Sequence, residues 1–177
     1  MKTKMTKGII IVLFLASMLI AVNAIPTQAC QAGDATLIAG GGNEKSAIVV
    51  GTVHVWICDD YLKVKYDLTD GWLLAETHLH VADSWEEIPQ KNGNPIPGKF
   101  DYKMEHDGVS EFTYSIPLAD LGDVDCVFIA AHAVVYNSCG CDCYMEETAW
   151  ADGGCNVDGF DFPGRNWATG FEYCLGC

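Results

Sequence analysis

Cysteine is the residue whose chemistry is easiest to anticipate in this sequence. The chain has nine cysteines, and most of them lie toward its C-terminal end. They are Cys30, Cys58, Cys126, Cys139, Cys141, Cys143, Cys155, Cys174 and Cys177. In an oxidising compartment such a set forms disulfides, and an odd number leaves at least one thiol free, modified or linked to another chain. The sequence leaves the connectivity open.

The segment Cys139-Gly140-Cys141-Asp142-Cys143 permits two kinds of chemistry. Three thiolates this close suit a soft metal ion such as Zn²⁺ or Cu⁺, with Cys155 as a fourth ligand. Their spacing, however, is not the two-residue gap of a zinc knuckle, and an oxidising compartment favours disulfides. We therefore predict that these cysteines bridge to separate partners such as Cys155, Cys174 and Cys177.

Three cysteines precede this segment. Cys58 is expected to end one strand and Cys126 to begin another. If both lie at one end of the domain, they pair; alternatively, the two positions are unrelated. Cys30 either reaches the C-terminal cysteines or is the odd thiol. Together the cysteines predict a disulfide-reinforced domain.

Histidines and carboxylates offer metal or acid–base chemistry. Glu76, His78 and His80 alternate, so a strand places them on one face in the manner of a metal-binding comb. The opposite, inward face would consist of Leu73, Ala75, Thr77, Leu79 and Val81. A neighbouring hairpin strand would set Lys63 opposite His78 and Lys65 opposite Glu76, and cations there repel a second cation. We therefore interpret the comb as a solvated polar face.

A hydrolase is the other function that histidines suggest. His106 lies in Glu105-His106-Asp107, and a histidine beside an acid can act as a general base. A hydrolase using His106 or His78 also needs a nucleophile, and no Gly-x-Ser-x-Gly motif accompanies them. His132, within an apolar strand, is interpreted as a hydrogen-bonded core histidine. We predict no catalytic residues and no enzymatic activity.

Two groups of residues suggest a bound ligand. Asp152, Asp158 and Asp161 lie among glycines, where carboxylates can gather Ca²⁺, although the spacing is not that of an EF-hand. The alternative is a solvated acidic loop, and no other cofactor is expected. A second group, Trp56, Trp72 and Trp85 with His78, offers rings that stack on sugars or anchor a protein partner. Core packing is the alternative for these rings.

Alternating apolar residues predict the strands that must position these side chains. Strands are expected over residues 46–58, 61–68, 72–82, 110–118, 126–136 and 166–174, with a short helical turn over 83–88. Short strands separated by turn residues are typical of an antiparallel β-sandwich. The stretch 126–136 is apolar on both faces, which indicates a central buried strand. Residues 137–165, rich in Cys, Gly and Asp, are expected to be an irregular loop insertion.

Two turns predict hairpins and fix their registers. Asp59-Asp60 and Asp70-Gly71 are each expected to form a two-residue loop. These loops would place apolar residues opposite apolar ones and Lys65 opposite Glu76. The expected apolar pairs are Val55 with Val64, Ile57 with Leu62, and Leu68 with Leu73.

The N-terminus and the charge bear on location and partners. Three lysines precede an apolar run over residues 8–22, and Val22-Asn23-Ala24 fits a cleavage site. We expect residues 1–24 to be a signal peptide and residues 25–177 to be one secreted or cell-envelope domain. The alternatives are an uncleaved N-terminal anchor and lipid attachment at Cys30. A formal net charge of −14 repels nucleic acid and anionic lipid, so only the N-terminal segment is expected to touch a membrane.

Several short strings in the chain carry a resemblance. They are Asp70-Gly71-Trp72, Glu76-Thr77-His78-Leu79, Glu105-His106-Asp107, Ile129-Ala130-Ala131-His132-Ala133, Glu147-Thr148-Ala149-Trp150-Ala151 and Asn166-Trp167-Ala168-Thr169. In this order, the segment from about Val50 to Tyr173 resembles a module of secreted and cell-surface proteins of bacteria and archaea. The resemblance implies an extracellular β-sandwich without an established activity, and residues 139–155 look like an insertion into its pattern.

The predicted function is an extracellular or cell-surface structural or interaction module without catalytic activity. Its partner would be an unspecified protein or glycan of the cell envelope or extracellular space. The alternative function is a carbohydrate- or Ca²⁺-binding module, and a hydrolase is the third candidate.

Overall fold

The computed structural model describes residues 32–42, 45–138 and 144–176. The strands are β1 (Gly33–Ala39), β2 (Ile48–Cys58), β3 (Tyr61–Leu68), β4 (Trp72–Ala82), β5 (Gln90–Lys91), β6 (Asn94–Pro95), β7 (Tyr102–Val109), β8 (Glu111–Pro117), β9 (Cys126–Ser138), β10 (Tyr144–Cys155), β11 (Asp158–Asp161) and β12 (Thr169–Cys174). The 3₁₀ helices are η1 (Trp85–Glu87), η2 (Pro97–Lys99) and η3 (Leu118–Asp120). No helix in these ranges has the length and apolar character needed to cross a bilayer.

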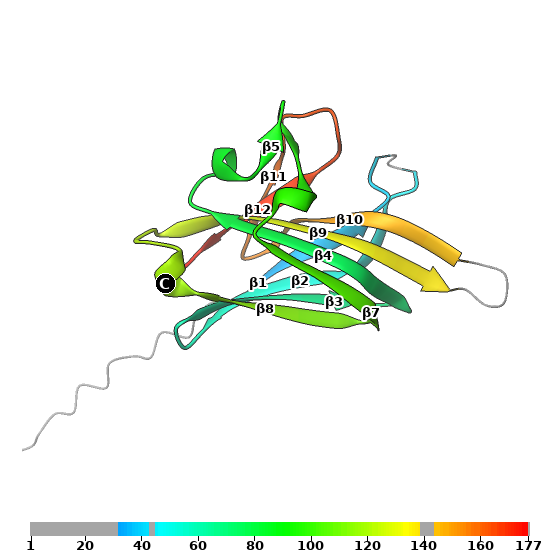
Figure 1. Cartoon of the computed structure of the whole chain (residues 1–177), viewed down its shortest axis with the longest axis horizontal. Coiled ribbons are helices and arrows are strands. Elements are labelled where there is room, and N and C mark those ends of the chain that lie inside the picture. The colour runs from blue at the N-terminus through cyan, green and yellow to red at the C-terminus, as the bar shows by residue number, and fades with distance from the viewer. Residues whose placement is uncertain (1–31, 43–44, 139–143, 177) are drawn as a thin grey trace, which may run out of the picture.

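The main sheet is antiparallel and curves until it is nearly closed into a barrel (Figure 1). Its strand order is β11-β12-β9-β10-β1-β2-β3-β8. One edge of β9 is shared by β12 and β10, and the other edge pairs with β4, which in turn pairs with β7. The predicted all-β antiparallel class is confirmed, as is the central position of β9. The finer description as a sandwich stays a prediction.

The two predicted hairpins had different outcomes. Between β2 and β3, Val55 lies opposite Val64 and Ile57 opposite Leu62, as predicted. The second register is wrong, because β3 pairs with β8, and β4 pairs with β9 and β7. Asp70 and Gly71 do form a tight turn with positive φ values of 53° and 80°, but this turn leads the chain to the opposite wall of the sheet. Turn residues determine where the chain bends, but they do not determine which strand the next one pairs with.

A β-bulge in β4 changes which residues of that strand face the core. The register shifts between Leu74 and Glu76, so the pattern of inward side chains moves by one position at Ala75. Leu74 is buried before the bulge, and Thr77 and Leu79 are buried after it. The prediction that Leu73 and Ala75 face inward is therefore wrong. The prediction that residues 76, 78 and 80 share the outer face of β4 is confirmed.

The cysteine-rich region is more regular than the sequence suggested. Residues 144–155 form β10, which pairs with both β9 and β1 and so lies within the main sheet. Residues 158–161 form β11. The prediction of an irregular inserted loop over 137–165 is therefore wrong for most of its described part. Long-range pairing with β1, a strand that the sequence did not reveal, stabilises this region.

The protein has two hydrophobic clusters. The larger one fills the inside of the curved sheet, with fully buried residues such as Tyr66, Leu74 and Phe171. The second one lies on the outer face of β4, β9 and β10, around Trp150 and Phe100. The chain segments 83–101 and 158–168 cover it, as the upper part of Figure 1 shows. This covered outer face positions both sites described below.

Candidate ligand-binding sites

Within the described residues, the structure assigns one disulfide, between Cys126 and Cys174. These residues lie directly opposite each other on β9 and β12. The predicted pairing of Cys58 with Cys126 is therefore wrong, as is the bridging of Cys174 to the segment 139–143. Cys58 and Cys155 carry exposed free thiols. The remaining predicted disulfide residues, Cys30, Cys139, Cys141, Cys143 and Cys177, lie outside the described residues.

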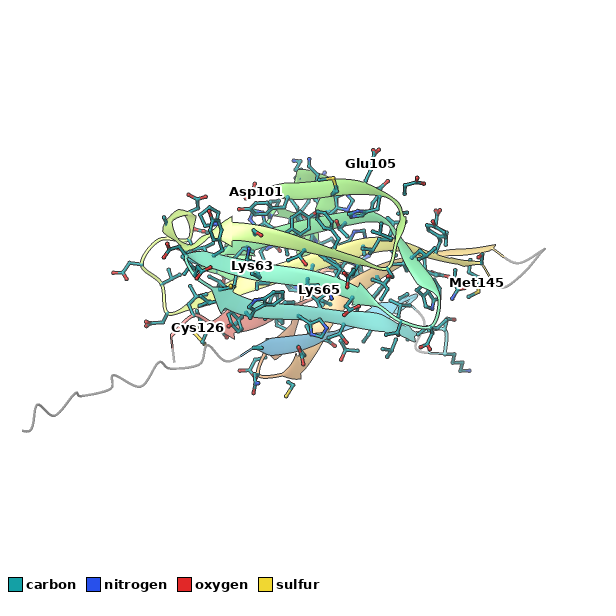
Figure 2. All side chains as sticks on the ribbon, turned by 90° about the horizontal axis from the view of Figure 1, so that it is seen from below. Lys63, Lys65, Asp101, Glu105, Cys126 and Met145 are labelled. Atoms are coloured by element: carbon teal, nitrogen blue, oxygen red, sulfur yellow. A yellow bond between two sulfur atoms is a disulfide. The ribbon has the colours of Figure 1, made fainter. Side chains whose placement is uncertain are left out.

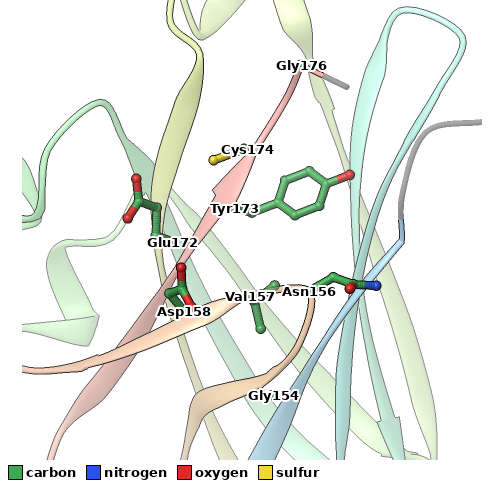
Figure 3. A pocket seen from close by; sticks show the side chains of 8 residues that line it. All are labelled: Gly154, Asn156, Val157, Asp158, Glu172, Tyr173, Cys174 and Gly176. Carbon is green, nitrogen blue, oxygen red and sulfur yellow. The ribbon is translucent and has the colours of Figure 1, made fainter. Parts of the chain in front are cut away.

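The three aspartates proposed for Ca²⁺ are divided between two hollows. Asp152 and Asp161 line one hollow, which also contains Trp167. Asp158 lies in another, opposite Glu172 and beside Cys174 (Figure 3). Residues 158 and 161 are an odd number of positions apart on β11, so they point to opposite faces of that strand. The structure does not bring the three carboxylates together.

The described residues do not group three carboxylates closely enough to form a calcium site. In the described parts of the chain, one group of three metal-ligating side chains has its ligand atoms within 4.8 Å of one another: Cys126, Glu172 and Cys174. Two of its three atoms are the sulfurs of the disulfide, so they are not available as thiolates.

The predicted aromatic ligand face is also dispersed. Trp72 is 4% exposed and belongs to the inner core. Trp56 lies on the outer face of β2 beside Lys63, and Trp85 packs against the outer cluster. Figure 2 shows Lys63 and Lys65 on the wall that contains β3. These three rings and His78 do not form one surface for a ligand.

Trp167 forms the aromatic part of a site that the sequence predictions missed. Its indole ring packs against Gly41 and Gly42, in the turn after β1. A Cβ atom on Gly41 would overlap this ring, so the close approach requires glycine. The run Gly40-Gly41-Gly42 was a usable signal for such an approach. Trp167 lies in the string Asn166-Trp167-Ala168-Thr169, and nothing in its spacing marks it as a site residue.

Two hollows lie on either side of Trp167. One has a volume of about 410 Å³ and is lined by Ile38, Gly41, Ala47, Asp152, Asp161, Trp167 and Thr169. The other measures about 320 Å³ and is lined by Gly40, Gly42, Ser46, Glu147, Thr148 and Trp167. The described lining therefore contains carboxylates and hydroxyls on both sides of an indole ring, and it contains no Lys, Arg or His.

Backbone groups position the polar side chains of the first hollow. Asp152 Oδ1 accepts a hydrogen bond of 2.7 Å from the backbone N–H of Gly153. A side chain at Gly159 would press against that carboxylate, so glycine there leaves it room. The Thr169 hydroxyl donates to the carbonyl of Ala151 at 3.0 Å. The hydroxyl keeps lone pairs as acceptors, and the hollow therefore suits a ligand that donates hydrogen bonds.

Four of the five histidines lie in three different environments. The fifth, His80, is buried beside Phe100, with its Nδ1 3.3 Å from Asp101 Oδ2, so the predicted solvated polar face is wrong for His80. His54 contacts Asp34 at 2.6 Å on the outer face of β2. His106 lies inside, where its Nε2 is 2.8 Å from the hydroxyl of Thr77. His78 and His132 lie side by side on the outer face of β4 and β9. His132 is 7% exposed and has a hydrogen-bond contact to His78, which confirms the predicted core histidine.

None of these environments completes a hydrolase site in the described chain. Thr77, the hydroxyl beside His106, is fully buried, and the neighbouring Glu105 points to the other face of β7. The hollow beside His78 contains Glu76 and Glu105 but no hydroxyl or thiol among its lining residues. A histidine, an acid and a nucleophile do not meet in either place.

The chain matches no family model, and no curated protein and no solved structure is significantly similar to it.

Proposed function

We propose that this chain is a non-catalytic interaction module of the cell surface or extracellular space, and that the hollows beside Trp167 hold its ligand. The observation that carries the proposal is the half-buried indole ring set between two hollows of acceptor side chains. A partly exposed aromatic ring with a few polar groups around it is a common basis for recognition.

A saccharide is the ligand class that this lining favours. The C–H face of a sugar ring packs on an indole, and sugar hydroxyls donate to carboxylates such as Asp152 and Asp161. Three carboxylates around Trp167 repel anionic ligands, so we propose a neutral or amino-bearing glycan. The proposal moves the predicted sugar contact from the scattered tryptophans to Trp167.

Calcium is the second candidate for the same place, because Asp152 and Asp161 line one hollow. Carboxylate and hydroxyl oxygens are the ligands that Ca²⁺ prefers, and waters would complete its shell. Under this alternative, the ion either acts alone or bridges to glycan hydroxyls.

The location and architecture belong to the same proposal. The N-terminal signal pattern over residues 1–24 supports export of a single domain over 25–177. The Cys126–Cys174 disulfide is compatible with an oxidising compartment. We also propose that the curved sheet acts as a β-sandwich, with β1-β2-β3-β8 packing against β7-β4-β9-β10, and that the partner is an envelope or extracellular glycan or protein.

The test is binding of the exported protein to an oligosaccharide array, in CaCl₂ and in EGTA. D161N removes an exposed carboxylate from the Trp167 hollow, and D158N removes an exposed one from the other face of the same strand. We expect D161N and W167A to weaken glycan binding about tenfold or more, with D158N unchanged. Equal binding by D161N, W167A and the unmodified protein would reject the site. Calcium alone predicts a rise in Tm with CaCl₂ that D161N abolishes.

A further inference from the structure

We propose that His78 and His132 form a binding site for a first-row transition metal ion such as Zn²⁺ or Cu²⁺. The two residues lie directly opposite each other on β4 and β9, and their Nδ1 atoms are 3.3 Å apart. Two nitrogens bound at about 2.0–2.1 Å to one tetrahedral ion lie about 3.3–3.4 Å from each other. The pair therefore has the spacing of two ligands before any ion arrives.

The strand pairing changes the charges expected around these histidines: Lys103 on β7 lies opposite His78, in place of Lys63. The expected neighbours Lys63 and Lys65 lie on β3, which pairs with β8, so they do not face the histidines. The strand beside His78 is instead β9, and it supplies a second imidazole at the matching position. Imidazole nitrogens are ligands that Zn²⁺, Cu²⁺ and Ni²⁺ prefer.

A neutral imidazole offers a nitrogen lone pair to a metal, and burial favours the neutral form. Burial and, to a smaller degree, the adjacent His78 lower the pKa of His132 to about 3. Burial also lowers the pKa of His78, which Glu76 raises in part and Lys103 lowers. In the ion-free pair, one Nδ1–H donates to the other Nδ1. Metal binding requires both rings to carry their proton on Nε2, a change of tautomer without net loss of protons.

An open hollow of about 260 Å³ lies beside His78 and is lined by Glu76, His78, Lys103, Met104 and Glu105. Glu76 Oε2 lies 3.7 Å from His78 Nε2, and its side chain is half exposed, so it can swing toward the ion. No third ligand atom in the described chain stands close enough to join the pair without such movement. Water or Glu76 would therefore complete the site.

Lys103 is the charge that opposes an ion at this position. It lies opposite His78 on β7, on the side away from His132. Its ammonium group donates to the carbonyl of Gly98 at 3.0 Å. The carboxylates of Glu76 and Glu105 on the same hollow offset this charge. Lys103 is therefore expected to weaken metal binding, and its removal should strengthen it.

Trp150 provides an optical readout of the pair. Its ring centroid lies 4.7 Å from that of His132. A paramagnetic Cu²⁺ ion bound to His132 should therefore quench the fluorescence of Trp150. Zn²⁺ added in excess should compete with Cu²⁺ for the same site and restore the fluorescence.

The experiment uses the exported protein without a histidine tag. Free thiols are first alkylated, because Cys58 and Cys155 are exposed and bind the same ions. ZnCl₂ is titrated by calorimetry and CuCl₂ by fluorescence. We expect one ion per chain, and affinity reduced at least about 100-fold in H78N, because even an outer-shell partner is worth about 10–100-fold. H54N, on the other face of the protein, should bind as the unmodified protein does.

Further variants make the result decisive. K103Q should bind more tightly, since it removes a cation beside the site. H78N replaces a partly exposed residue, and near-UV circular dichroism checks its fold. Equal affinity of H78N and the unmodified protein, or absence of binding at 1:1 stoichiometry, would overturn the proposal. Loss of binding in H54N but not in H78N would also overturn it, by assigning the ion to the other histidine.

Discussion

The indole ring of Trp167 packs directly on Gly41, where a Cβ atom would overlap the ring. This contact joins the chain before β12 to the turn after β1, two segments far apart in the sequence. It also forms the wall between the two hollows that we propose as the ligand site.

G41A should therefore destabilise the protein and impair glycan binding. The new methyl group would overlap the Trp167 ring, and overpacking of this kind costs about 1–3 kcal/mol. Urea unfolding measures the change. G98A is the matched control, because a Cβ at Gly98 meets no atom within 4 Å. A G41A protein as stable as G98A would contradict the packing described here.

Removing the Cys126–Cys174 disulfide should lower stability by about 4 kcal/mol at most, since it closes a loop with a sequence separation of 48. The double variant C126A/C174A tests this by urea unfolding in the absence of reductant. C58A/C155A removes two exposed free thiols and should leave the midpoint unchanged. If that control lost as much stability, the assigned pairing would be wrong.

T77V should destabilise the protein by about 1–3 kcal/mol, because it removes the hydroxyl partner of His106 and leaves the Tyr114 hydroxyl with only the Thr77 carbonyl. The Thr77 hydroxyl lies 2.8 Å from both His106 Nε2 and the Tyr114 hydroxyl. Valine has nearly the same shape, so the loss reports the hydrogen bonds. T113V, at an exposed position on β8, is the control and should change little.

Stability should fall as the pH is lowered from about 6.5 toward 5, because His132 is buried in its neutral form. Its pKa is about 3 when folded and near the ordinary histidine value of 6.5 when unfolded, so between these values the unfolded chain takes up the proton and the folded chain does not. Stability therefore rises with pH in this window, by roughly 1 kcal/mol per pH unit for one such group. His78 and His80, whose pKa values burial also lowers, act in the same direction.

Urea unfolding at several pH values between 5 and 7.5 measures this slope. H132Q removes this buried imidazole and should flatten the dependence. H54N, whose imidazole lies at the surface beside Asp34, should retain it. An H132Q slope equal to that of the unmodified protein would show that His132 does not govern the dependence.

Much of the local structure was predictable because strands alternate their side chains. The inward face of β3, the outward face of residues 76, 78 and 80, and the Val55–Val64 register all followed from this period of two. The bulge at Ala75 was not predictable, because an extra residue in one strand leaves no mark on local propensity. The Ca²⁺, aromatic and cysteine sites were predicted from residue type alone, which does not show which side chains lie close together. Most of the residues proposed for each site lie apart in the structure.

The two turns at Asp59-Asp60 and Asp70-Gly71 were predictable from sequence, but the strand pairing that follows each turn was not equally so. Both contain residues with positive φ and both reverse the chain, as their residue types predicted. Only the first joins two paired strands. The partner of β4, the disulfide between Cys126 and Cys174, and the contact of His78 with His132 all depend on β9 lying at the centre of the sheet. By itself the sequence determined strands, turns and faces, because these depend on neighbouring residues. The tertiary structure alone decided which distant strands meet, since their pairing depends on how the whole chain buries its apolar surface.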